Sequence, residues 1–190
     1  MSDYRHLMEN LYLAHQSFHR HWNEWQNGSL PQKVKKQLKG HEPESVTVAR
    51  NKMLDALNLL FNTKLAPLEI KFRENPESAV DEIIEFLSID IPAFRCGYAK
   101  EQFLKRLKSV PLKSFQQQKL REIALDLLSR PHYRREIGAW SRLMIALADQ
   151  SFIEELENLS ESSDEMIRQR AKRVRDKIFQ HRTNLASGSD

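Results

Sequence analysis

The stretch DYRHLMENLYLAHQSFHRHWNEWQ, residues 3–26, has an apolar residue at every third or fourth position. This spacing matches the 3.6-residue period of an α-helix and differs from the two-residue period of a strand. Gly28 and then Pro31 follow the stretch, in the order in which these residues commonly end a helix. The sequence therefore predicts one long amphipathic helix, with an apolar stripe made by Tyr4, Leu7, Leu11, Ala14, Phe18, Trp22 and Trp25.

The composition of the chain favours an all-α fold. Only 5 glycines and 7 prolines occur in 190 residues, which is few for the many turns of an all-β protein. Hydrophobic residues make up 40% and charged residues 29%, as is typical of a globular domain. We expect either a multi-helix bundle or a short stack of helices, with a long N-terminal helix in both cases.

Four parts are expected along the chain. The long amphipathic helix occupies residues 1–28, and a basic connection with several lysines follows over residues 29–44. A helical domain is expected over residues 45–182, because short helical patterns with short connections cover it. Residues 183–190 have the composition of a disordered tail.

Local signals place breaks inside the predicted helical domain. A helix over about residues 44–63 is expected to end before Pro67, because proline interrupts the interior of a helix. Apolar and polar residues also alternate over 68–72 and 87–91, so a small pair of strands is an alternative there. The tetrapeptide at residues 162–165, SSDE, is expected to form a capping box at the start of the last helix.

Two segments of similar pattern lie in the C-terminal half. Residues 120–124 read LREIA and residues 167–171 read IRQRA, 47 residues further on. The pattern resembles that of HEAT and armadillo repeats over residues 98–182 at most, and the alternative is a helical bundle without repeats. The resemblance implies a scaffold that binds protein or nucleic acid along an extended face, without an active site.

Aromatic residues at the end of the N-terminal helix are candidates for partner binding. Phe18, Trp22 and Trp25 continue its apolar stripe, and tryptophan is enriched at the centres of protein interfaces. Burial of these three residues in the protein's own core is the alternative, as we expect for Trp140 further along. An apolar stripe of this length must be covered by its own chain, a second copy or another protein.

Charge is distributed in blocks near the C-terminus. We consider Arg168, Lys172 and Arg175 as a site for nucleic acid or an acidic partner, because they share one flank of the last predicted helix. A solvated, salt-bridged surface is the alternative interpretation. The expected buried face of this helix separates these three residues from Arg170, Arg173 and Lys177, which weakens the nucleic-acid interpretation.

No catalytic motif is recognisable, and we predict no catalytic residue, metal site or cofactor. His15 and His19 have the spacing of a metal-binding pair, but no cluster of further ligands accompanies them at a recognisable spacing. Cys96 is the single cysteine, so no disulfide can form within the chain. An incidental thiol is the expected role of Cys96.

These observations lead to three functional hypotheses. The first is a non-enzymatic interaction protein, acting as an adaptor, regulator or assembly subunit with a protein partner or as a homo-oligomer. The second is a nucleic-acid-binding subunit that uses the basic helices, and the third is a helical enzyme without a visible motif. No apolar run of membrane-spanning length occurs and the N-terminus lacks an apolar signal core, so we expect no membrane association and a cytoplasmic location.

Overall fold

The structure, a computed structural model, describes residues 3–28, 42–91, 93, 95–130 and 136–187. About 85% of these residues are helical, and no strand occurs among them. The all-α prediction is therefore confirmed, and the alternative of a strand pair is wrong. In the described part of the chain, no helix is both long and apolar enough to cross a membrane.

The chain divides into two compact units, Met1–Ile70 with Ile91–Cys96 and Lys71–Asp90 with Gly97–Asp190. One boundary between the units falls inside the helix α4 (Ala66–Glu74). Most of the predicted basic connection, residues 29–41, lies outside the described residues.

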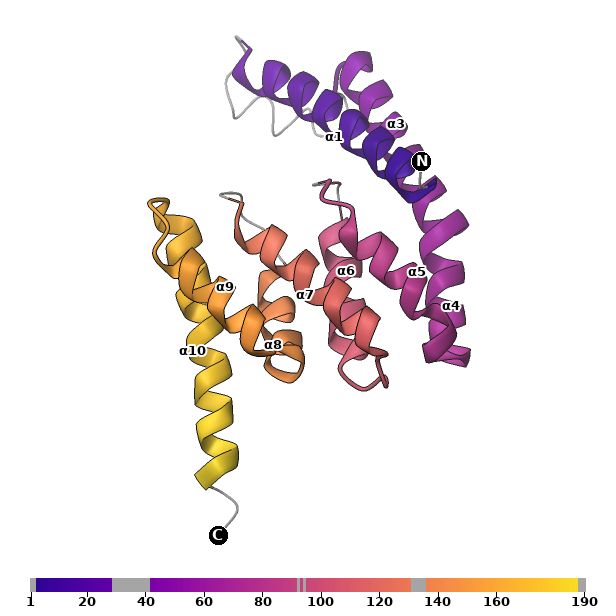
Figure 1. The fold of residues 1–190 in the computed structure, drawn as a ribbon. Coiled ribbons are helices and arrows are strands. Elements are labelled where there is room, and N and C mark those ends of the chain that lie inside the picture. Colours follow the sequence, from indigo (N-terminus) through magenta and orange to yellow (C-terminus); the bar gives the residue numbers. More distant parts are fainter. Residues whose placement is uncertain (1–2, 29–41, 92, 94, 131–135, 188–190) are drawn as a thin grey trace. The chain divides into compact units, whose positions relative to one another are not determined.

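The first unit is built on two long helices, α1 (Asp3–Asn27) and α3 (Glu44–Leu60), which lie side by side (Figure 1). The bounds of α1 agree with the predicted helix to within one residue. Its buried side chains belong to Tyr4, Met8 and Leu11, and they face a buried row on α3. That row consists of Val46, Ala49, Met53, Leu57 and Leu60.

Pro67 does not end the second helix, contrary to the sequence prediction. After α3 the chain forms a π-helical turn, Phe61–Leu65, and then continues as α4 (Ala66–Glu74). The backbone N–H of Ala66 donates to the carbonyl of Phe61, five residues earlier, where an α-helix would use the carbonyl four residues earlier. The wider turn lies directly before Pro67, so it relieves the clash that a proline ring makes with the preceding turn of an α-helix.

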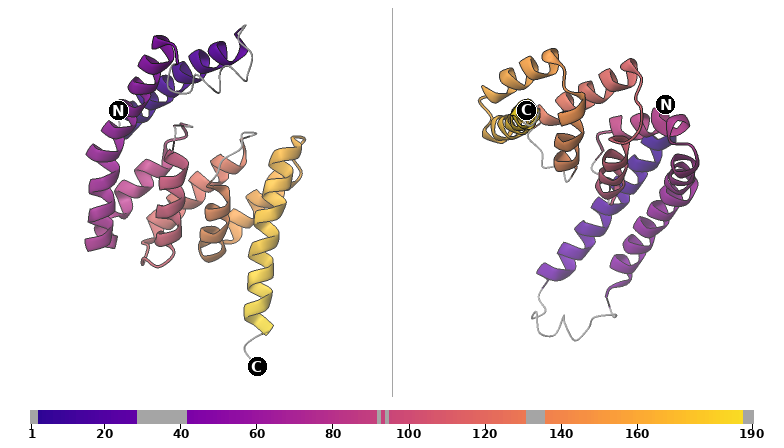
Figure 2. Two further views of the ribbon diagram at one scale, coloured as in Figure 1. Left: turned by 180° about the vertical axis from the view of Figure 1, so that it is seen from behind. Right: turned by 90° about the horizontal axis from the view of Figure 1, so that it is seen from below.

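The second unit contains two rows of helices. The first row is α5 (Pro76–Ser88), α7 (Ser114–Leu128) and α9 (Gln150–Ser160), in which α7 contacts both neighbours. The second row is α6 (Cys96–Leu107), α8 (Ile137–Leu147) and α10 (Glu165–Ser187), as the views in Figure 1 and Figure 2 show. Helix α8 packs against α7 and α10, and α10 also packs against α9. We call these rows the first layer and the second layer.

The core between the layers contains Trp140, the residue that the sequence predicted to be buried. Trp140 is only 3% exposed, and Leu143 and Met144 on the same helix are fully buried. The ring of Phe103 on α6 lies 6.1 Å from that of Phe86 on α5 and 6.0 Å from that of Phe72. Edge-to-face aromatic contacts of this kind add to the stabilisation from burial.

Side-chain caps begin several of these helices. Asn75 accepts a hydrogen bond from the backbone N–H of Ser78, and Pro76 occupies the first turn of α5. At the start of α10 the predicted capping box is wrong. Asp164 caps this helix by accepting from the backbone N–H groups of Met166 and Ile167, whereas the side-chain hydroxyl of Ser162 accepts from the backbone N–H of Asp164.

The two similar sequence segments fall on helices of different layers. Residues 120–124 lie on α7 in the first layer, and residues 167–171 lie on α10 in the second layer. The offset of 47 residues therefore does not relate equivalent helices. Both small residues, Ala124 and Ala171, are buried, which agrees with their expected role of allowing a close approach between helices. Helix α10 also continues to Ser187, five residues past the predicted end at residue 182.

Candidate functional site

The three predicted partner-binding aromatics form a row along the second half of α1. The ring centroids of Phe18 and Trp22 are 6.0 Å apart, and those of Trp22 and Trp25 are 5.1 Å apart. All three side chains are partly exposed, and α1 has no buried side chain after Leu11. We call these three residues the aromatic row.

Helix α3 supports one end of the aromatic row through Arg50. The guanidinium carbon of Arg50 lies 5.8 Å from the centre of the Phe18 ring, a distance at which a cation attracts the ring face. Arg50 also pairs with Glu42, with 3.0 Å between Nη2 and Oε1. The position of Phe18 is therefore set by its own chain, and its ring keeps part of its surface in solvent.

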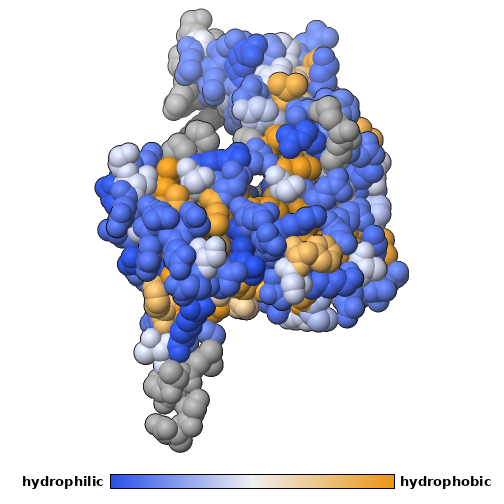
Figure 3. Space-filling view, in the orientation of Figure 1, coloured by the Kyte–Doolittle hydropathy of each residue, from blue (hydrophilic) through white to orange (hydrophobic). Residues whose placement is uncertain are grey.

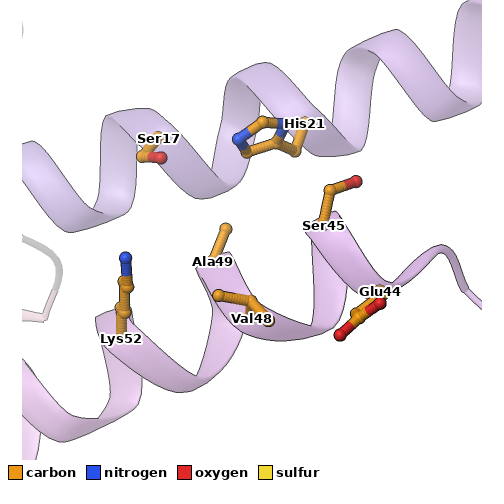
Figure 4. Close-up of a pocket in the computed structure, with 7 residues that line it drawn as sticks. All are labelled: Ser17, His21, Glu44, Ser45, Val48, Ala49 and Lys52. Atoms are coloured by element: carbon orange, nitrogen blue, oxygen red, sulfur yellow. The ribbon is translucent and has the colours of Figure 1, made fainter.

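A shallow groove of about 360 Å³ lies between α1 and α3. Figure 4 shows Ala49 and Lys52 of α3 pointing toward α1, whereas Glu44 points away. The groove is lined by small, apolar and charged residues, which are Ser17, His21, Glu44, Ser45, Val48, Ala49 and Lys52. Among the described residues, no hydrogen bond joins Ser17 or Ser45 to His21, whose Nδ1 lies 3.5 Å from the carboxylate of Glu24.

His15 and His19 approach each other closely on α1. Their Nε2 atoms are 3.0 Å apart and their ring centroids 4.4 Å apart. Burial, followed by the charge of His19, lowers the pKa of His15. Within the described part of the chain, no group of three or more potential ligands surrounds a common point, so the pair has no third protein ligand there.

The three predicted basic residues of α10 are not equally available. Arg168 donates to the carbonyl of Ser162 at 2.7 Å and pairs with Glu165. Arg175 is held by the carboxylate of Asp176 at 3.1 Å. Lys172 is exposed and makes no ion pair or hydrogen bond within the described residues.

Several other basic side chains bind the carbonyls at the ends of helices. Arg170 donates to the carbonyl of Arg130 after α7, and Arg182 donates to that of Ala148 after α8, at 2.9 and 2.8 Å. Lys100 is buried and donates to the carbonyl of Leu87 in the last turn of α5 and to that of Ile89 just after it. Such carbonyls lack a partner within their own helix and carry partial negative charge, so these contacts hold the second unit together.

Arg130 joins the end of α7 to the residues after α5. Its guanidinium pairs with Asp126 and Asp90, and the hydrogen bond to Asp126, followed by the charges of both carboxylates, raises the pKa of Arg130. The interaction with Asp90 spans 40 residues of sequence. The pair with Asp126 has the local i,i+4 spacing, whereas neither the helical pattern nor local spacing indicates the contact with Asp90.

The charged residues on the helices of the second unit are segregated by layer. The helices of the first layer carry nine acidic and two basic residues, whereas those of the second layer carry eleven basic and three acidic ones. The face drawn in Figure 3 is mostly hydrophilic, with hydrophobic residues in small separate patches. The segregation creates an electric field across the unit that favours anions at the second layer.

Comparisons with known proteins give no family for this chain. No family model matches it, and neither a curated protein nor a solved structure is significantly similar to it.

Proposed function

We propose that the protein is a non-enzymatic α-helical interaction module, an adaptor, regulator or assembly subunit, whose aromatic row contacts a protein partner. The observation that carries the proposal is the contrast between the two halves of α1. Its first half buries Tyr4, Met8 and Leu11, whereas Phe18, Trp22 and Trp25 in the second half remain partly exposed. Apolar stripes of amphipathic helices are normally covered, so a further surface is expected to cover the aromatic row.

The residue types favour a protein as the partner. Tryptophan and arginine are enriched among the residues that dominate binding energy in protein interfaces. The row contains Trp22 and Trp25, and Arg50 lies beside Phe18. Large amphipathic rings contribute contact area while losing few side-chain degrees of freedom.

A second copy of the chain is the partner that we propose to test first. Two-fold symmetric pairs are the commonest assembly among soluble proteins, and a single surface patch then serves both subunits. Pairing two helix hairpins through their apolar sides would produce the four-helix arrangement in which such stripes are commonly buried.

Light scattering of the full-length chain tests the proposal. We expect wild-type protein to have the mass of a dimer, and the double variant Trp22→Gln, Trp25→Gln to have the mass of a monomer with an unchanged helical circular dichroism spectrum. Leu13→Gln is the matched control, because Leu13 is an exposed apolar residue of the same helix outside the stripe. A wild-type chain that is always monomeric, with tryptophan variants that unfold, would assign the row to the core and contradict the proposal.

A further inference from the structure

The second layer has basic side chains that the fold does not use. Arg142 on α8 and Lys172 and Arg173 on α10 are all exposed. None of the three makes a hydrogen bond, an ion pair or a ring contact within the described residues. They differ in this respect from Arg168, Arg170 and Arg182, which bind backbone carbonyls.

These three side chains lie on one face of the unit. Arg142 is two residues after the buried Trp140, so it lies about 200° around α8, on the side opposite the core. On α10, Lys172 and Arg173 are adjacent residues about 100° apart, one on each side of the line opposite the buried Ala171, Val174 and Ile178. Both therefore border the outer side of the helix, although they belong to different flanks. Helices α8 and α10 are neighbours within the second layer, so the sides opposite their buried residues both face away from the first layer. We call Arg142, Lys172 and Arg173 the basic outer face.

Few acidic groups counteract the charge of this face. On α10, Asp176 is paired with Arg175 and Glu165 with Arg168, and α8 has no acidic residue. The acidic first layer lies on the opposite side of the unit. A polyanion is therefore attracted to the second layer and repelled from the first, which gives its approach a direction.

The side chains of this face favour a phosphate backbone over an acidic protein. Protein interfaces obtain their binding energy mainly from buried aromatic and apolar anchors and are depleted in lysine. Among the described residues, α8 exposes no large apolar side chain, and α10 exposes only Met166 and Phe179, which are 13 residues apart and form no cluster. Phosphate backbones instead bind clustered lysine and arginine by releasing condensed counterions, without apolar anchors. Neighbouring helices lie about 8–10 Å apart, so α8 and α10 can contact phosphates of the same chain.

We infer that the basic outer face binds the phosphate backbone of a nucleic acid without sequence preference. Arg142, Lys172 and Arg173 contact phosphates, and Arg168 and Arg175 keep their structural contacts with Ser162 and Asp176. The inference is independent of the aromatic row, which lies in the other unit.

Fluorescence anisotropy with a labelled 30-base-pair DNA duplex and a single strand of equal length tests the inference. At about 50 mM salt we expect the duplex to bind, and the logarithm of the association constant should fall linearly with the logarithm of salt concentration. The variant Lys172→Glu, Arg173→Glu should bind at least about tenfold more weakly, and its salt slope should be smaller by about 2. The single strand should show the same dependence on these residues with a shallower slope.

A charge-matched control separates the face from the effect of net charge. Arg20→Glu, Lys119→Glu changes the net charge equally, but these exposed residues lie on α1 and on the first layer. We expect this control to bind the duplex within about twofold of the wild-type affinity across the salt series. Charges far from the ligand have a smaller effect, because salt screens them. If the glutamate variant loses helicity, Lys172→Gln, Arg173→Gln provides the comparison.

Three results would overturn the inference. The first is wild-type protein that binds neither nucleic acid at low salt. The second is equal weakening by the control, which would show that net charge alone attracts the ligand. The third is a poly-glutamate peptide that binds this face more tightly than the duplex does, which would identify an acidic protein as the partner.

Discussion

Trp140 shows how much one side chain contributes to the core of the second unit. It is almost fully buried, and its indole N–H has no acceptor among the described residues. We expect Trp140→Ala to reduce the free energy of unfolding by about 3–5 kcal/mol, because it leaves a large cavity. Trp140→Phe should cost well under half as much, since it removes an unpaired donor and keeps most of the ring volume. Urea titration measures both, and equal losses would show that the indole N–H has a partner.

The lowered pKa of His15 predicts that the stability of the protein depends on pH. The pKa is lowered in the folded state, so the unfolded chain binds more protons as the pH falls. The free energy of unfolding should therefore decrease as pH falls through the ordinary pKa of histidine, about 6.5. His15→Asn should make the unfolding midpoint in urea less sensitive between about pH 7.5 and 5.5. An unchanged pH dependence in the variant would contradict this role of His15.

Single residues also mark the limit of the sequence-based prediction. The burial of Trp140 follows from its helical period, because Leu143 and Met144 share its face. The roles of Arg170 and Arg182 do not follow, since each binds a backbone carbonyl 34–40 residues earlier in the chain. A sequence shows how many arginines a helix has. It does not show which of them the folded chain uses, because their acceptors come from distant helix ends.

At the level of single elements, the cap of α10 distinguishes two interpretations of residues 162–165. Asp164→Ala should destabilise the protein by about 0.5–2 kcal/mol, because it removes the acceptor of two backbone N–H groups. Ser162→Ala should cost clearly less. Thermal unfolding of the two variants measures the difference, and the reverse order would restore the capping box expected from the sequence.

The helix through Pro67 explains one failure of the element-level prediction. Proline is a reliable signal for the end of a helix only when the preceding turn is α-helical. The π-turn at Phe61–Leu65 changes that condition, and its sequence FNTKL contains no glycine or proline that would indicate it. By contrast, Asn75 and Pro76 were predictable as the start of α5, because a capping side chain and a first-turn proline act locally.

At the scale of the whole molecule, the all-α class followed from composition and period, whereas the grouping of helices into two units is seen only in the contacts of the folded chain. Helix α3 belongs with α1 because their buried rows face each other, and this pairing depends on contacts between distant segments. The separation of charge between the two layers of the second unit is likewise visible only when the helices are placed. The candidate aromatic row was identifiable from the sequence, whereas the basic outer face could be defined only after the helices were assigned to layers.

The central claim is that the aromatic row of α1 is covered by a partner surface, for which a second copy is the first candidate. Hydrogen exchange of the full-length protein at about 1 and about 100 µM tests it most directly, because self-association follows mass action. We predict that amides of residues 12–27 exchange more slowly at the higher concentration, while those of α5, α7 and α9 are unchanged. Equal protection of residues 12–27 at both concentrations, matching that of the first half of α1, would contradict the claim.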